Sequence, residues 1–143
     1  MRILFDTNVL LDVLLNRAPH VVPASRLMVQ VEQRRIDGLM GATSLTTIHY
    51  LATKAVGGAR ARKHVQTLLL LFDVAPVGRG VLADALSLGF PDYEDAVLHE
   101  AARHAGATGI VTRDPDGFAR ANLHVYSPDE LLTMARALPP SAS

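Results

Sequence analysis

Short apolar runs alternate with longer amphipathic stretches along most of the chain. The runs Ile3–Phe5, Leu39–Ala42 and Gly109–Thr112 stand between polar segments and turns. Runs of this length are typical of strands that are buried on both faces. In the stretches between them, apolar residues recur at intervals of three or four, which is the spacing of a helix with one buried face. The pattern predicts an α/β fold in which strands and helices alternate.

The expected elements form a three-layer sandwich. A central, mostly parallel sheet of about four to five strands is flanked by helices on both faces. Thr7 or Asn8 is expected to cap the first helix, and Thr43 or Ser44 the third. The expected strands are 3–5, 39–42, 73–77, 109–112 and 124–126. The expected helices are 9–15, 22–35, 44–56, 59–71, 81–88, 92–105 and one that begins at Pro128.

Length and composition narrow the class of protein. A chain of 143 residues with 49% apolar content is long enough for one domain and too short for two. We expect this domain to span residues 1–134 and residues 135–143 to form a disordered tail. The absence of cysteine excludes disulfides and thiolate metal sites. The 14 Lys and Arg residues offset the 14 Asp and Glu residues, so contact with nucleic acid must depend on a local basic patch.

The same features predict where the protein works. No apolar run approaches the roughly 20 residues that span a bilayer, so no contact with a membrane is expected. The chain opens directly into the first apolar run, without separate charged and apolar signal regions. A cytoplasmic protein is therefore expected.

Acidic residues gather at three points where strands end or helices begin. Ligand sites in an open α/β sheet lie outside the carboxyl ends of its strands, so the first and third groups face one edge. The second group joins them if its helix starts over that edge. Carboxylates so crowded repel one another unless they share a cation. The groups are Asp6; Asp92, Glu94 and Asp95; and Asp114 and Asp116.

The chemistry of these groups indicates which cation they would hold. Hard oxygen ligands, with neither cysteine nor a paired-histidine motif, favour Mg²⁺ or Mn²⁺ over Zn²⁺. Each aspartate taken alone also has a structural explanation, as a helix cap or a turn residue. The coincidence of all three groups is what favours a site. Asp12 interrupts an otherwise apolar helix, which predicts that it is either paired or facing the site.

Three segments together resemble the best-marked motifs of the PIN-domain family. They are Phe5–Leu10 (FDTNVL), Asp92–Ala96 (DYEDA) and Val111–Phe118 (VTRDPDGF), in the family's order. The resemblance extends to about Leu132 and implies a PIN-like sandwich with an acidic pocket and a Mg²⁺- or Mn²⁺-dependent ribonuclease activity. Many small bacterial members are VapC-like toxins of toxin–antitoxin pairs. The resemblance therefore also implies an RNA substrate, an antitoxin partner and a homodimer.

The resemblance also assigns roles to individual residues. Asp6, Asp95 and Asp114 match the catalytic metal ligands, and Asp116 is a metal ligand that could contribute instead of Asp114. The alternates to Asp95 are Asp92 and Glu94, and Asn8 and Thr112 are expected to orient carboxylates or water. From the residues themselves, Arg113 and Arg17 are candidates for binding substrate phosphate, and Arg113 is the better one because it flanks Asp114. His99 and His104 are expected to be exposed.

One position departs from the family pattern. The family carries a glutamate in its third helix, but no acidic residue lies between Met40 and Phe72 here. The best alignment puts His49 at that position. A neutral imidazole can bind a metal or its water, but it brings no negative charge. His49 is therefore either a site residue or a surface one, and its presence raises the alternative of a domain that no longer cuts RNA.

Competing functions are separated by particular residues. A haloacid-dehalogenase-type phosphatase needs a second aspartate two residues after Asp6, where this chain has Asn8. A receiver domain needs a lysine beyond the third strand, and none follows Lys63. The leading hypothesis is a metal-dependent RNA endonuclease, and the alternative is a catalytically degenerate PIN domain that binds RNA or protein.

Overall fold

The computed structural model describes residues 1–139 and contains one five-stranded sheet in which every pair of neighbours is parallel. The strand order is β3-β2-β1-β4-β5, so β1 is central and β3 is an edge strand. Ile3 of β1 aligns with Gly38 of β2 and Gly109 of β4. The strands are β1 (Arg2–Phe5), β2 (Asp37–Gly41), β3 (Asp73–Ala75), β4 (Gly109–Val111) and β5 (His124–Tyr126).

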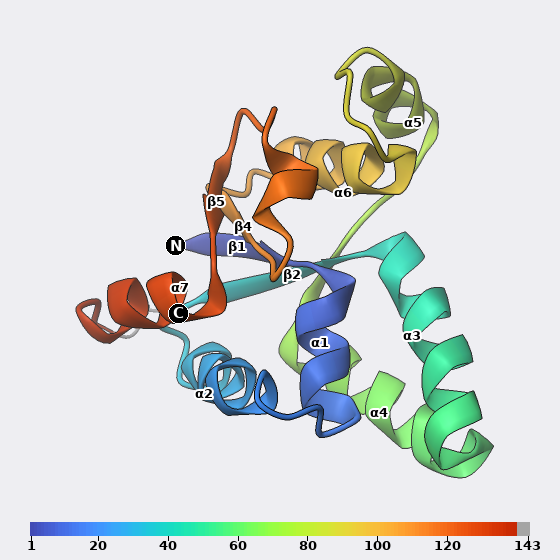
Figure 1. Ribbon diagram of the computed structural model, residues 1–143, viewed down its shortest axis with the longest axis vertical. Helices are drawn as coiled ribbons and strands as arrows, with labels where there is room; N and C mark the ends of the chain where they lie inside the picture. The colour runs from blue at the N-terminus through green and yellow to red at the C-terminus, as the bar shows by residue number, and fades with distance from the viewer. Residues whose placement is uncertain (140–143) are drawn as a thin grey trace.

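Helices connect the strands and cover both faces of the sheet, as predicted (Figure 1). Inside one face, Ile3, Phe5 and Met40 pack against α1, α2, α4 and α7. Inside the other, Leu4 and Leu39 pack against α5 and α6. The helices are α1 (Thr7–Leu14), α2 (Val21–Glu32), α3 (Ala42–Val56), α4 (Gly58–Leu71), α5 (Arg79–Leu86), α6 (Tyr93–His104), α7 (Pro128–Arg136) and the 3₁₀ turn η1 (Pro115–Phe118). The predicted three-layer α/β sandwich is confirmed.

Two helix caps differ from the expected ones. Asp6, rather than Thr7 or Asn8, caps α1, because its side chain accepts a hydrogen bond from the Thr7 amide. The cap of α3 is Gly41, and the helix follows β2 with no loop between them. A Cβ at Gly41 would lie 2.5 Å from Leu98 Cδ2, so glycine allows the end of β2 to approach α6.

Several element boundaries also shift. The helix expected over 22–35 ends at Glu32, because Arg34 adopts a positive φ of 60° and reverses the chain. At the C-terminus, α7 runs to Arg136 and buries Ala135, so residues 135 and 136 belong to the packed domain rather than to a tail. The last part of the expected tail, 140–143, lies outside the described residues. Within residues 1–139, every helix is too short or too polar to cross a membrane.

Candidate active site

Asp6 lies where β1 ends, and its carboxylate is buried and fixed. The Thr7 amide donates to Oδ1 at 2.7 Å, and the Thr112 hydroxyl donates to Oδ2 at 2.7 Å. Burial raises the pKa of Asp6, and the negative charge of Asp114 adds to this. The hydrogen bonds from Thr112 and Thr7, with the positive charge of Arg113, act in the opposite direction. Asp6 is therefore held in one orientation at the carboxyl edge of the sheet.

Thr112 joins this carboxylate to the loop that follows β4. Its hydroxyl donates to Asp6 and accepts a hydrogen bond of 3.0 Å from the Asp114 amide. The Asp114 carboxylate in turn caps η1, accepting from the Gly117 amide at 3.4 Å. Because β1 and β4 are neighbouring parallel strands, their carboxyl ends bring Asp6 and Asp114 to the same edge.

Asp95 comes to the cluster from the first turn of α6. Asp92 caps this helix, accepting from the amides of Glu94 and Asp95, and so fixes where the helix begins. The pKa of Asp95 is raised to about 7, first by its burial and then by the negative charges of Asp6, Asp92, Asp114 and Glu94. Carboxylates from β1, α6 and the η1 loop thus act on one another electrostatically.

Gly117 shows how closely two of these carboxylates approach. A Cβ at this position would lie 2.8 Å from Asp95 Oδ2 and 3.0 Å from Asp114 Oδ2. The two acidic oxygens therefore border one small space that only glycine leaves open. Asp116 and Glu94, the sequence neighbours of Gly117 and Asp95, are exposed.

The sequence of residues 2–116, which contains Asp6, Asp95 and Asp114, matches the family model for the PIN domain. The chain belongs to the PIN-domain family. No curated protein matches it at the level of sequence.

Solved structures share the PIN fold over most of their length. VapBC2 from Rickettsia felis, bound to a DNA fragment from their promoter, matches with a TM-score of 0.70 and 12% identity over 89% of this chain and 98% of that one. A toxin–antitoxin complex from Klebsiella pneumoniae matches at 0.67 and 20%, over 87% and 96%. FitAcB from Neisseria gonorrhoeae matches at 0.67 and 20%, over 88% and 97%. At these identities the likeness is one of fold.

The arginines expected to bind phosphate are paired with Asp12 of this PIN domain. Asp12 is buried, with 1% of its side chain exposed, and bonds both Arg17 and Arg113. Of the two possibilities for Asp12, pairing is the one found. Asn8 lies beside this group, and its Oδ1 accepts a long hydrogen bond from the Arg113 amide at 3.5 Å.

His49 is exposed on α3, at a recess that Arg62, Val65 and Gln66 of α4 also line. Ser44 of α3 contacts the start of α1, where it is fully buried and accepts a hydrogen bond of 2.8 Å from the Thr7 hydroxyl. The Thr7 amide also donates a hydrogen bond to Asp6, so Ser44 bonds a residue that holds the Asp6 carboxylate in place. The sequence pattern indicated Ser44 only as a possible cap of the third helix.

The expectation that His99 is exposed is wrong. His99 is fully buried on α6, and the Asn122 amide donates to its Nε2 at 3.0 Å. Nδ1 therefore carries the hydrogen and donates to Glu100 Oε2 at 3.1 Å. Burial lowers the pKa of His99, which favours this neutral form, although Glu100 opposes the shift. His104 is exposed, as predicted.

A second acidic group lies on α5 and α6. Within residues 1–139, only Asp84, Glu100 and His104 form a trio whose possible ligand atoms all lie within 4.8 Å of one another, so those of the aspartate cluster are more widely spaced. Arg103 bonds both carboxylates of this trio, at 2.9 Å to Glu100 and 3.2 Å to Asp84. A guanidinium already neutralises these acids, so we interpret the group as an ion-pair network.

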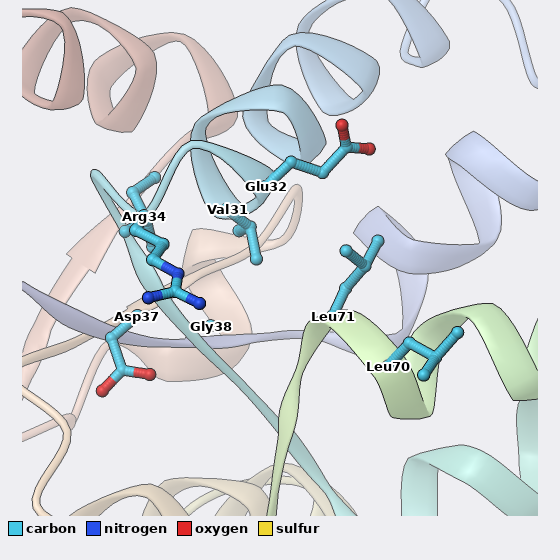
Figure 2. Close-up of a pocket in the computed structure, with 8 residues that line it drawn as sticks. Val31, Glu32, Arg34, Asp37, Gly38, Leu70 and Leu71 are labelled. Atoms are coloured by element: carbon cyan, nitrogen blue, oxygen red, sulfur yellow. The ribbon is translucent and has the colours of Figure 1, made fainter. Parts of the chain in front are cut away.

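Figure 2 shows a hollow lined by residues of α2, β2 and α4, none of which belongs to the acidic cluster. It has a volume of about 500 Å³ and lies at the amino edge of the sheet, between the ends of α2 and α4 and the start of β2. Leu70, which is 86% exposed, stands at its margin. The carboxylates of the site lie at the opposite, carboxyl edge.

Proposed function

We propose that this PIN domain is a divalent-metal-dependent RNA endonuclease. One observation carries the proposal: carboxylates from three separate elements meet at one edge of the sheet, because Thr112 bonds both Asp6 and the Asp114 amide, and a Cβ at Gly117 would lie within 3.0 Å of Asp95 and Asp114. No ion pair joins any of the three to an Arg, Lys or His side chain in residues 1–139. Uncompensated carboxylates at the carboxyl edge of an α/β sheet are suited to a cation.

The residues present fit Mg²⁺ or Mn²⁺. The donors are hard carboxylate oxygens, and Gly117 leaves room between Asp95 and Asp114. We assign Asp6, Asp95 and Asp114 as the metal ligands and catalytic residues, with Asp116 as a further ligand. When bound, the cation would supply Lewis acidity and activate water for phosphodiester hydrolysis.

The remaining residues would hold this arrangement in place. Thr112 fixes the Asp6 carboxylate and the backbone of Asp114 through one hydroxyl, so its role is to position both ligands. Asp92 sets the start of α6 and thereby the place of Asp95. Glu94 stands close enough to Asp95 to add negative charge.

We further propose that the chain is the toxin of a toxin–antitoxin pair. It shares its fold with a chain of a toxin–antitoxin complex, which supports an antitoxin protein as its partner. A cytoplasmic location and a homodimer remain parts of this proposal.

Incubation of a mixed RNA pool with the protein and Mg²⁺, Mn²⁺ or EDTA tests the activity. We expect cleavage that needs the metal and stops with EDTA. A folded protein that cuts no RNA under any metal would overturn the proposal. That result would favour the second candidate, a catalytically degenerate module that binds RNA or protein. The observation that supports this candidate is that α3 carries no acidic residue.

Gly117→Ala is expected to weaken metal binding by about tenfold or more, because the new methyl would push apart the carboxylates of Asp95 and Asp114. Titration calorimetry with Mn²⁺ measures this. Gly58→Ala is the matched control, since nothing lies within 4 Å of a Cβ at Gly58. Unchanged affinity in Gly117→Ala would mean that the two carboxylates do not share a cation.

His49→Glu is expected to change cleavage and metal affinity by no more than about twofold, the usual limit for an exposed substitution. His49 lies at the recess between α3 and α4, so a glutamate there would not restore the family's acid. Rates of RNA cleavage for His49→Glu and His49→Ala check this. A clear rise in His49→Glu alone would show that this position reaches the site.

A further inference from the structure

Two arginines and one buried aspartate form a compact charged group beside the carboxylate cluster. Arg113 approaches Asp12 with Nε at 2.5 Å from Oδ2 and Nη2 at 3.2 Å from Oδ1. Arg17 approaches the same carboxylate with Nε at 2.9 Å from Oδ1. Both guanidiniums therefore bond the same carboxylate oxygen, Oδ1. Two positive charges against one negative charge leave a net charge of +1 on a chain that is neutral overall.

Not all hydrogen-bond donors of the two arginines are used within this group. Arg17 uses Nε on Asp12 and Nη2 on the Asn8 carbonyl, at 3.2 Å, and Arg113 uses Nε and Nη2 on Asp12. In both arginines Nη1 makes no hydrogen bond within residues 1–139. The side chains are 39% and 28% exposed, while Asp12 is 1% exposed. The aspartate is thus a buried anchor, and the arginines remain accessible to a ligand.

The position of the group ties it to the proposed site. Arg113 stands between Thr112, which bonds Asp6, and Asp114. The Arg113 amide also donates to Asn8 Oδ1 at 3.5 Å, two positions after Asp6, so the two groups are near each other. Asp12 lies in α1, and Arg17 lies just after this helix ends. Asp6 caps the start of the same helix. The arginines therefore lie on the α1 side of the carboxylates.

We propose that Asp12 positions Arg17 and Arg113 as one clamp for a phosphodiester group of single-stranded RNA. This phosphodiester is the neighbour of the one that lies at the carboxylates of Asp6, Asp95 and Asp114. This inference rests on the proposed function. Guanidinium groups recognise phosphate oxygens through charge-assisted hydrogen bonds. A carboxylate that already holds both of them reduces the side-chain entropy lost on binding. The clamp also supplies the local positive charge that the neutral composition requires.

Binding of fluorescein-labelled oligouridine in EDTA, followed by fluorescence anisotropy across a range of NaCl concentrations, tests the clamp without cleavage. Arg17→Gln and Arg113→Gln are each expected to weaken binding about tenfold, as for one lost charge-assisted hydrogen bond. Each should lower the slope of log affinity against log salt by about 0.7, the value for one phosphate of a single strand. Arg136→Gln, an exposed arginine in the last turn of α7, is the matched control and should bind like the wild type.

Two further variants separate a placed clamp from general charge. Arg17→Lys keeps the charge but loses the planar guanidinium, so we expect affinity to fall nearly as far as in Arg17→Gln. Asp12→Asn raises the net charge by one, yet its amide nitrogen cannot accept from Arg113 Nε, and neither arginine keeps a negative charge to hold it in place. Weaker binding by Asp12→Asn therefore supports positioning. Thermal melting of every variant reports its folding.

The outcomes distinguish this proposal from the nuclease proposal. Arginine variants that melt at a lower temperature but keep the wild-type affinity and salt slope would overturn the clamp and leave Asp12 a purely structural role. Wild-type affinity in Arg17→Lys, or stronger binding by Asp12→Asn, would mean that the arginines contribute only their positive charge and that their placement by Asp12 does not matter for RNA binding. A wild type that binds no oligouridine would also overturn the clamp. If the arginine variants weaken binding but the wild type cuts no RNA with Mg²⁺ or Mn²⁺, the clamp stands and the nuclease fails.

Discussion

Asp6→Asn is expected to lower RNA cleavage by about a thousandfold or more while leaving the fold intact. Asparagine caps a helix as well as aspartate does, so the bond from the Thr7 amide is kept. The Thr112 hydroxyl can rotate to accept from the new amide nitrogen while still accepting from the Asp114 amide. What the variant loses is the negative charge that a divalent cation requires.

Cleavage of a labelled RNA pool in Mg²⁺ or Mn²⁺ measures this loss, and thermal melting checks the fold. Asp129→Asn is the matched control, because Asp129 is an exposed residue in the first turn of α7, outside the cluster. Cleavage at the wild-type rate in Asp6→Asn would show that the metal site is wrongly assigned. An equal loss in Asp129→Asn would show that the effect does not belong to the site.

The second large effect concerns Asp95 and pH. Its pKa is raised from 3.8 to about 7, so a divalent cation must displace a proton from this carboxylate below pH 7. The apparent affinity for Mn²⁺ is therefore expected to fall about tenfold per pH unit as the pH drops below 7, and to level off above it. Calorimetric titrations from pH 5.5 to about 8 check this expectation. An affinity that is independent of pH would mean that the cation does not contact Asp95.

The same carboxyl makes the stability of the metal-free protein depend on pH. Between about pH 4 and 7 the folded state keeps a proton that the unfolded state has lost, so stability falls as the pH rises through this interval. Asp95→Asn cannot ionise and should be more stable than the wild type at pH 8, with little difference near pH 4. Solvent screens a half-buried carboxylate, so we expect a gain of about 1 kcal/mol, or a few degrees in melting temperature. Equal melting temperatures at pH 8 would contradict the raised pKa.

The pattern of apolar residues was sufficient to predict the layers and the edge at which the acids meet. The run Ile3–Phe5 is fully buried, and its last residue leads directly into Asp6. A strand with this composition must be covered on both faces, which leaves its carboxyl end as the place where a polar side chain can emerge. Asp114 follows β4 in the same way, and β4 is the neighbour of β1. The common edge was therefore predictable.

His99 shows what local pattern cannot supply. Its neighbours Glu100, Arg103 and His104 are polar and suggest a solvated face, yet α6 buries all of residues 96–102. The polar side chains are tolerated there because Asn122 supplies a hydrogen bond to His99 and Arg103 pairs with Glu100. One of these partners is distant in sequence, so the burial of His99 depends on the folded chain.

The sequence by itself determined the order of strands and helices along the chain, the family motifs and the place of Asp6 and Asp114 at one edge, because period and strand direction are local properties. That Asp95 joins them depends on where α6 starts over the sheet, which the fold decides. The tertiary structure alone decided that Arg113 pairs with Asp12, which lies 101 positions away, and that His49 stands at the recess with α4. Helical periodicity fixes which residues share a face but not what that face meets. The partner of a charged side chain, and hence its chemistry, depends on contacts that only folding creates.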